Sequence, residues 1–349
     1  MKKSLMKGNE ALAEAAIKAG CKCFFGYPIT PQTEISAYLS KRMPKVGGVF
    51  LQAESEIAAI NMVYGCAGSG VRCMTSSSSP GISLKAEGIS YIAGADLPCV
   101  IVNVQRGGPG LGGIQPSQSD YWQATRAMGH GDFRLIVFAP SSVQELADLT
   151  GKAFDLADKY RMPVMILADG LLGQMMEPVS FNGSESVPST LNEKPWAANG
   201  HNHSRKKNVI NSLYLQSDKL EKKIRERFDK YEEIKKSESA AVYEKGAEIV
   251  VVAYGSTARI AKSAVDMARA EGINASLFRP VTLWPFPEKE INEACENAKT
   301  VLVTEMSMGQ MVDDVKLALK CGIPVEFFGR TGGVIPEPDE ILKKIKEVM

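Results

Sequence analysis

The sequence predicts an α/β protein with two three-layer α/β domains, because short apolar runs alternate with helical patterns along most of the chain. The alternation breaks at residues 177–208, which are rich in Asn, Ser, Pro and His and show little periodicity. We therefore expect a first domain over residues 1–190, a linker carrying a charged amphipathic helix over residues 191–245, and a second domain over residues 246–349.

Length and composition are those of a protein with a substantial core. The chain has 349 residues, of which 44% are hydrophobic and 23% charged, and this excludes a disordered chain. Lysine plus arginine number 41 and aspartate plus glutamate 40. Because this balance creates no strong field, neither nucleic acid nor a membrane surface is expected as a partner. The sequence also contains no run of about 18 apolar residues that would predict a membrane span.

Six short apolar segments of the first domain are expected to form a mainly parallel sheet. They are Cys23–Gly26, Val49–Gln52, Val71–Thr75, Cys99–Val104, Leu135–Ala139 and Val164–Ala168. The N-terminal segment begins like a signal peptide, but Glu10 and Glu14 stand where its apolar region should be. We therefore expect it to be a helix of the mature protein. Ser142 followed by Glu145 predicts a capping box at the start of a later helix.

The linker and the second domain continue the same pattern. An apolar stripe with i,i+4 ion pairs on its other side indicates a solvated amphipathic helix rather than a basic recognition element. Its residues are Leu220, Ile224, Phe228, Tyr231 and Ile234. The strands expected beyond it are Ile249–Ala253, Ala275–Phe278, Val301–Thr304 and Pro324–Phe327, with helices starting after Ser256, near Pro287 and near Gly309.

Three polar motifs follow predicted strands, at the sheet edge where open α/β proteins bind ligands. The first is Tyr27–Pro31, in which Thr30 would be the N-cap of a helix that has Pro31 in its first turn. From that position its hydroxyl would meet backbone amides or a ligand. A plain capped turn would have the same spacing, so the motif alone leaves both interpretations open.

The second motif contains two carboxylates, and the third contains one guanidinium. Glu54 and Glu56 precede a segment of small residues, and either one could contact a ligand or simply favour the first turn of a helix. Arg106 begins a glycine-rich loop that matches neither the dinucleotide fingerprint nor the P-loop. At the end of a strand it could bind a carboxylate or phosphate by two hydrogen bonds, or lie free on the surface.

Other residue patterns exclude several kinds of site. The seven cysteines include no C-x-x-C pair, so neither an iron–sulfur cluster, a structural zinc nor any other metal is expected in this chain. The absence of a disulfide framework indicates a reducing, cytoplasmic location. Ser76–Ser79 lack a nearby histidine and a G-x-S-x-G elbow, which argues against a serine hydrolase. His130 could titrate near neutrality or be an ordinary loop histidine.

Taken together, the motifs resemble those of the alpha subunit of the 2-oxoacid:ferredoxin oxidoreductases, which use thiamine diphosphate. The resemblance covers nearly the whole chain apart from the linker. In the first domain it rests on residues 27–31, the Glu56 segment, residues 74–75 and 79–81, the Arg106 loop and residues 141–145. In the second domain it rests on residues 255–256, 279–280, 285–287, 305–306 and 329–333.

This resemblance implies a thiamine pyrimidine-binding domain followed by a transketolase C-terminal-like domain. It also implies that Glu56 is the catalytic glutamate that hydrogen-bonds N1′ of the aminopyrimidine. Glu56 is preferred to Glu54 because its distances in sequence to Gly65, Gly81 and Arg106 match the family. Implied as cofactor-binding residues are Pro28, Ile29, Thr30 and Glu56. Thr30 and Arg106 would in addition bind the carboxylate and oxo group of the substrate.

The resemblance implies an oxidoreductase that acts on the oxo group of a 2-oxoacid, with an iron–sulfur protein as electron acceptor. Oxidative decarboxylation would yield an acyl-coenzyme A and reduced ferredoxin. The chain has neither a G-D-G motif followed by an N-N type diphosphate and magnesium motif nor cluster cysteines. By resemblance, a beta subunit would share the thiamine diphosphate and hold Mg²⁺, and a ferredoxin-like delta subunit would hold the iron–sulfur clusters. A gamma subunit would also be separate, and this alpha subunit would be inactive alone.

Residues 113–121 look most like those of members acting on a branched-chain 2-oxoacid, 3-methyl-2-oxobutanoate. Arg126 leaves 2-oxoglutarate open, because that substrate needs a second cation for its distal carboxylate. A ferredoxin-independent thiamine enzyme and a non-catalytic binding module remain as further alternatives. A dinucleotide dehydrogenase is disfavoured by the missing fingerprint.

Overall fold

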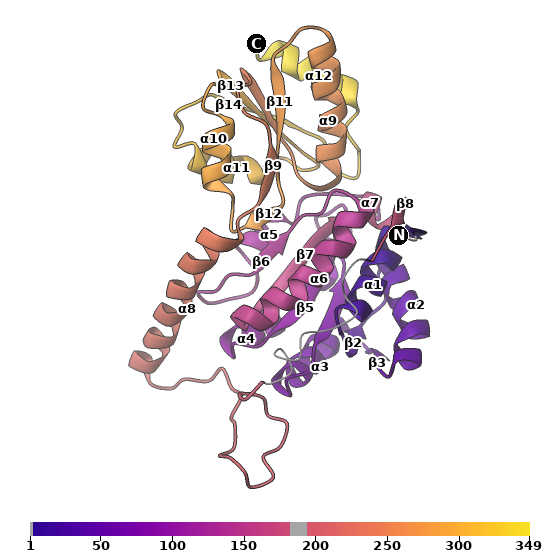
Figure 1. Ribbon diagram of the computed structural model, residues 1–349, viewed down its shortest axis with the longest axis vertical. Coiled ribbons are helices and arrows are strands. Elements are labelled where there is room, and N and C mark those ends of the chain that lie inside the picture. The colour runs from indigo at the N-terminus through magenta and orange to yellow at the C-terminus, as the bar shows by residue number, and fades with distance from the viewer. Residues whose placement is uncertain (1–2, 182–193) are drawn as a thin grey trace.

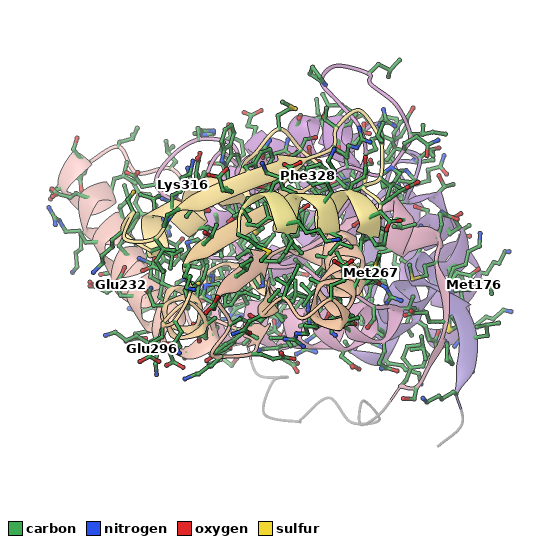
Figure 2. The ribbon with its side chains drawn as sticks, turned by 90° about the horizontal axis from the view of Figure 1, so that it is seen from above. Met176, Glu232, Met267, Glu296, Lys316 and Phe328 are labelled. Atoms are coloured by element: carbon green, nitrogen blue, oxygen red, sulfur yellow. The ribbon has the colours of Figure 1, made fainter. Side chains whose placement is uncertain are left out.

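The computed structural model describes residues 3–181 and 194–349 and contains two layered α/β units, one above the other in Figure 1. The larger sheet has seven strands in the order β12-β6-β7-β5-β4-β2-β3. The smaller sheet has five, in the order β14-β13-β10-β11-β9. Seen from above, the second unit lies over the first (Figure 2). The predicted α/β class with helices layered on sheets is confirmed.

The larger sheet and its covering helices come mostly from the first half of the chain. Its strands are β2 (Cys23–Gly26), β3 (Val49–Gln52), β4 (Cys73–Ser77), β5 (Cys99–Gln105), β6 (Ile136–Phe138), β7 (Pro163–Asp169) and β12 (Thr282–Trp284). The helices are α1 (Gly8–Lys18), α2 (Thr33–Arg42), α3 (Glu56–Gly68), α4 (Ser79–Gly94), α5 (Tyr121–Thr125), α6 (Val143–Tyr160) and α7 (Gly170–Gln174), with a 3₁₀ turn at Met43–Val46. All pairs within this sheet are parallel except β12 with β6.

The second unit follows a long helix, α8 (Ser217–Glu238), which runs along the side of the first unit in Figure 1. Its elements are β9 (Ala241–Tyr243), β10 (Ile249–Val252), α9 (Gly255–Ala270), β11 (Ala275–Pro280), α10 (Glu288–Ala294), β13 (Thr300–Glu305), α11 (Met311–Ala318), β14 (Val325–Gly329) and α12 (Pro338–Glu347). The predicted domain limit at residue 190 lies outside the described residues, and the domain limits stay a prediction.

The strands that the sequence did not predict are short and depend on distant partners. β1 (Ser4–Lys7) replaces part of the expected N-terminal helix, and β8 (Met176–Val179) enters the segment expected as loop. These two pair only with each other, antiparallel. β9 adds to β11, and β12 adds to β6. Such three- and four-residue strands carry too little periodicity to be recognised without their partners.

One local prediction is corrected by the side chains. Ser142 does cap α6, because its Oγ accepts a hydrogen bond from the Glu145 amide at 3.1 Å. The capping box is not completed, since the Glu145 carboxylate accepts from the Ser141 amide at 2.8 Å and pairs with Arg279 at 2.9 Å.

The predicted amphipathic helix is present as α8. Its apolar stripe is buried at Tyr231 and Ile234, in the C-terminal half, and its charged side is exposed and carries the Glu221–Arg225 ion pair.

The two units are joined through Gln118, which is fully buried between them. Its Nε2 donates to the Tyr254 carbonyl at 2.9 Å, and its Oε1 accepts from Thr257 Oγ1 at 2.7 Å and from the Met306 amide at 3.0 Å. Every polar atom of this side chain is therefore used across the interface. The loop that follows β5 is tied in this way to the second unit.

We predict that Gln118→Leu lowers the free energy of unfolding by about 1–3 kcal/mol, because the Met306 amide would stay buried without its partner. Urea denaturation followed by circular dichroism measures the change. Gln216→Leu, at an exposed position before α8, is the matched control and should leave the transition where it is. Equal midpoints for the two variants would contradict the role given to Gln118.

Candidate active site

Glu56 begins α3 and lies on the buried side of that helix. The Ser55 hydroxyl caps the helix by accepting from the Ala58 amide at 3.1 Å. Glu56 shares the buried stripe with Ile60 and Val63 and is 5% exposed, whereas Glu54 is exposed before the helix starts. Glu56 is therefore buried and Glu54 exposed, which distinguishes the two carboxylates that the sequence pattern left as alternatives.

The Glu56 carboxylate faces a glycine of the neighbouring helix. A Cβ placed on Gly81 of α4 would lie 2.7 Å from Glu56 Oε1 and closer still to Ser77 Oγ. Two helical turns further along α4, a Cβ on Gly88 would lie 2.5 Å from the Ile60 side chain. The two helices approach so closely at these points that only glycine fits there. The approach brings the start of α4 against the start of α3.

Several polar groups at this junction have no protein partner. No hydrogen bond or ion pair reaches the Glu56 carboxylate within residues 3–181 and 194–349. The hydroxyls of Ser77 and Ser78, both fully buried, are also without partners among the described residues. Buried polar groups are normally hydrogen-bonded, so this wall has unmet capacity for a polar ligand. A carboxylate and two hydroxyls match the donors and acceptors of an aminopyrimidine.

Arg106 and Thr30 are brought together, as predicted for a shared site, but through the Thr30 backbone. Arg106 is 7% exposed, and its Nη1 donates to the Thr30 carbonyl at 3.0 Å, while Nη2 donates to Leu111 at 3.2 Å. Its Nε is buried without a partner in the described structure. The guanidinium is thus held in one orientation by two carbonyls and keeps its Nε donor unused.

The prediction that Thr30 is a helix N-cap is wrong. The Gln32 amide donates to the Ile29 carbonyl at 3.1 Å, which forms a turn, and α2 begins only at Thr33. The side chain of Thr30 is exposed beside this turn, as is that of Pro28, while Ile29 is partly buried. The side chain of Thr30 is therefore exposed to solvent and does not cap the helix.

Asp120 and Ser79 support the backbone of Arg106, and sequence reasoning did not identify either as a site residue. The Arg106 amide donates to Ser79 Oγ at 3.1 Å, and that hydroxyl donates to Asp120 at 2.6 Å. Asn103 also donates to Asp120, at 2.9 Å. Burial raises the pKa of Asp120, while the hydrogen bonds from Ser79 and Asn103 oppose that rise. The start of α4 and the end of β5 are fixed together by this network.

A third missed residue is Lys85, which is fully buried in α4. Its Nζ donates to Thr75 Oγ1 at 2.6 Å and to the Ser76 carbonyl at 3.0 Å. Burial lowers its pKa to about 7, and the nearby Glu56 carboxylate opposes that fall. The available signal was a lysine inside the apolar helical stripe that contains Ile82 and Ile89.

The second unit contributes a loop to one side of the site. A Cβ on Gly333 would clash with the Gln115 side chain, and a Cβ on Gly107 would lie 3.6 Å from the Gly332 carbonyl carbon. The glycine-rich segments after β5 and β14 therefore pack against each other. This contact places the Arg106 loop between the two units.

The comparisons with known proteins agree with this geometry. Residues 14–244 match the family model for pyruvate flavodoxin/ferredoxin oxidoreductase, thiamine diphosphate-binding, and residues 247–341 match that for pyruvate:ferredoxin oxidoreductase core domain II. The chain belongs to this family of 2-oxoacid:ferredoxin oxidoreductases. The family predicted from the motifs is confirmed, and with it the class of enzyme, an oxidoreductase subunit whose first domain is of the thiamine diphosphate-binding type.

Individual relatives match along almost the whole chain. Ketoisovalerate oxidoreductase subunit VorB of Methanothermobacter marburgensis is 51% identical over 100% of this chain and 98% of its own. The 2-oxoglutarate synthase subunit KorA of the same organism is 39% identical over 97% of both chains. A structure of 2-oxoglutarate:ferredoxin oxidoreductase from Magnetococcus marinus has a TM-score of 0.88 and 28% identity, covering 99% of this chain and 65% of that one.

A more distant structure, a split gene transketolase, has a TM-score of 0.60 at 14% identity and shows the fold alone. Two features are absent from the described residues, a membrane-spanning helix and a group of metal-ligating side chains. No helix among them has the length and apolar character needed to cross a membrane. No three of their His, Cys, Asp and Glu side chains gather as metal ligands.

We predict that Gly81→Ala destabilises the protein by about 1–3 kcal/mol, because the new methyl group must displace Glu56 and Ser77. Gly65→Ala in α3 is the matched control, since a Cβ there meets nothing within 4 Å. That control should keep or slightly raise stability, because alanine favours a helix over glycine. Thermal unfolding compares the two. A Gly81→Ala variant as stable as Gly65→Ala would show that the two helices do not touch at Gly81.

Proposed function

We propose that this chain is the alpha subunit of a thiamine diphosphate-dependent oxidoreductase that converts 3-methyl-2-oxobutanoate, also called ketoisovalerate, to an acyl-coenzyme A and reduces ferredoxin. The observation that carries the proposal is Glu56 at the junction of α3 and α4, a residue 5% exposed whose carboxylate makes no hydrogen bond to the described residues. Full-length similarity to a ketoisovalerate oxidoreductase subunit, at 51% identity, supports the substrate.

The proposed roles at the coenzyme follow from unmet hydrogen-bonding capacity. Glu56 would hold N1′ of the aminopyrimidine, and the free hydroxyls of Ser77 and Ser78 are further candidates for polar contacts. Pro28 and Ile29 would form the apolar wall that excludes water from the ring. When bound, thiamine diphosphate supplies the nucleophilic carbon and the electron sink for decarboxylation. Glu56 contributes a proton site next to the ring, and its burial keeps that site away from bulk water.

The proposed substrate contacts are the groups left free beside Arg106. Two carbonyls hold the guanidinium in place, so its unused Nε can donate to a carboxylate or oxo oxygen without losing side-chain freedom. The carbonyl of Thr30 bonds to the same arginine, and its exposed side chain would supply a hydroxyl donor. A fixed cation suits the carboxylate of a 2-oxoacid, and a neighbouring hydroxyl suits its oxo group.

The pairing of Arg126 supports a branched-chain acid over 2-oxoglutarate. Arg126, the residue that kept 2-oxoglutarate open, forms an ion pair with Asp314 of the second unit. Asp314 also accepts from the Tyr121 hydroxyl at 2.6 Å. Arg126 is thus engaged in an interdomain contact and is a poor candidate for the distal carboxylate of 2-oxoglutarate. The 2-oxoglutarate synthase subunits at 39% identity and below keep that acid as the second candidate.

We further propose that a beta subunit covers the site and contributes Mg²⁺ and the diphosphate contacts, with gamma and delta subunits completing the enzyme. Large apolar side chains are exposed on the elements that frame Glu56 and Arg106. They are Tyr27, Val49, Leu51, Ile57, Leu84, Leu111 and Ile114, each at least 36% exposed. Several exposed apolar side chains on neighbouring elements are typical of a surface that another protein covers. The iron–sulfur clusters would belong to the delta subunit, and ferredoxin would accept the electrons.

We predict that Glu56→Gln lowers turnover of the assembled complex by about 10²-fold or more, because glutamine cannot take up or release the proton at the coenzyme. The assay is coenzyme A-dependent reduction of ferredoxin or a viologen dye. Glu54→Gln is the matched control and should keep wild-type turnover, since Glu54 is exposed. Full activity of Glu56→Gln would reject the proposed role.

We predict that the reconstituted complex oxidises 3-methyl-2-oxobutanoate with a higher kcat/KM than 2-oxoglutarate, because the paired Arg126 offers no second carboxylate site. Parallel assays with the two acids test the choice. Arg126→Met should leave the ratio of the two kcat/KM values unchanged, because the residue acts only in the interdomain contact. Reduction of ferredoxin in the presence of 2-oxoglutarate but not of 3-methyl-2-oxobutanoate would reject the branched-chain assignment.

A further inference from the structure

Ser79 begins α4 in a backbone conformation that serine rarely adopts. Its φ is +21°, on the positive side where glycine is favoured, and the residue is only 8% exposed. Pro80 follows it, and a proline disfavours the right-handed helical conformation for the residue before it. A glycine would begin the helix here with less backbone strain. Helix formation alone therefore does not account for a serine at this position.

Hydrogen bonds hold Ser79 in this conformation and form a closed ring with Asn103 and Asp120. The Ser79 amide donates to Asn103 Oδ1 at 3.1 Å, and Asn103 Nδ2 donates to Asp120 Oδ2 at 2.9 Å. The Ser79 hydroxyl closes the ring by donating to the same carboxylate oxygen at 2.6 Å. Asn103 is fully buried in β5. A strained residue persists only where its surroundings fix it, and this ring is what fixes Ser79.

The hydroxyl of Ser79 also reaches the substrate side of the proposed site. Its oxygen accepts a hydrogen bond from the Arg106 amide at 3.1 Å. Arg106 is therefore held at its backbone by Ser79 and at its guanidinium by the carbonyls of Thr30 and Leu111. Removing the hydroxyl would take away the backbone support and leave both partners of the guanidinium in the chain.

The same turn of the chain carries the coenzyme side of the proposed site. Ser77 and Ser78, whose hydroxyls have no partner among the described residues, immediately precede Ser79. Gly81 follows two residues later, and a Cβ on it would lie 2.7 Å from Glu56 Oε1. Ser79 thus joins the groups proposed to meet the aminopyrimidine to the arginine proposed to bind the 2-oxoacid. The packing of α4 on α3 does not involve its hydroxyl.

We propose that Ser79 is a positioning residue that fixes Arg106 relative to the coenzyme, so that the carboxylate and oxo group of the 2-oxoacid meet the coenzyme in one geometry. This inference rests on the proposed function, because it needs a coenzyme beside Glu56 and a substrate at Arg106. The strained backbone is kept because glycine, which would relieve it, has no hydroxyl to accept from the Arg106 amide. A purely structural serine would serve only to close the ring with Asn103 and Asp120.

The strain is tested by thermal unfolding of the full chain without coenzyme. Ser79→Ala removes the hydroxyl and keeps a Cβ at positive φ, whereas Ser79→Gly removes the hydroxyl and relieves the backbone. We expect Ser79→Gly to unfold at a higher temperature than Ser79→Ala. If Ser79→Ala is as stable as Ser79→Gly or more stable, the backbone is not strained and the inference is overturned.

The positioning role is tested in the assembled complex, by steady-state kinetics with 3-methyl-2-oxobutanoate and by thiamine diphosphate binding. We expect both Ser79 variants to lower kcat/KM for the 2-oxoacid by about 10²-fold, because a displacement of about 1 Å of an orienting group costs that much. The loss should lie mainly in KM, with thiamine diphosphate affinity unchanged. A purely structural role predicts instead that the more stable Ser79→Gly keeps more activity than Ser79→Ala. Ser263→Ala, at an exposed position of α9, is the control and should keep wild-type kinetics.

Asp120 supplies the conservative comparison. Asparagine keeps a carbonyl oxygen that can accept from both Ser79 and Asn103. Asp120→Asn should therefore keep a KM for the 2-oxoacid near that of the wild type, whereas Asp120→Ala should raise it as Ser79→Ala does. Equal losses in Asp120→Asn and Asp120→Ala would show that the charge of Asp120 acts instead of its hydrogen bonds, and would overturn the positioning role.

These experiments separate the inference from the function on which it rests. A wild-type KM in both Ser79 variants, or a loss of coenzyme affinity in step with activity, would overturn the positioning role even if the complex is active. Failure of the wild-type complex to bind thiamine diphosphate or to oxidise a 2-oxoacid would reject the proposed function instead. In that case the unfolding temperatures of the two variants would still report the strain at Ser79.

Discussion

The close approach of α3 and α4 is the constraint on which the site depends. Without side chains at Gly81 and Gly88, the two helices meet closely enough to bury a carboxylate at the first turn of α3. The same approach places the start of α4 next to the end of β5, where Ser79 and Asp120 hold the backbone of Arg106. A few glycine contacts therefore determine where an acid, an arginine and several free hydroxyls lie relative to one another.

The second unit is part of this arrangement rather than an appendage to it. Gln118 stands between the Arg106 loop and the second unit, and every polar atom of its side chain bonds to that unit. The glycines after β14 pack on the loop from the other side. A change in the position of the second unit would therefore be transmitted to Arg106 through contacts already present.

The sequence predicted those parts of the protein that depend on local pattern. Long apolar strands such as β5 and β7 follow from runs that one segment contains. The expected roles of Glu56 and Arg106 came from the family resemblance instead, because the local patterns left each of them open. The start of α2 was misjudged because a turn at Ile29 and Gln32 precedes the helix, and a Thr-Pro pair alone does not reveal that turn. Lys85 was missed because its burial depends on β4 and α3, which are distant from it in sequence. The site roles themselves stay proposals, since they await the coenzyme.

The strand β12 has a consequence for any attempt to divide the chain. It follows the start of the second unit in sequence, yet it pairs with β6 and forms the edge of the first sheet. A fragment ending near residue 244, where the first family model stops, would lose that edge strand and leave the backbone of β6 open. Since β6 is fully buried and apolar, its unpaired edge would pair with strands of other chains, and such a fragment would tend to aggregate.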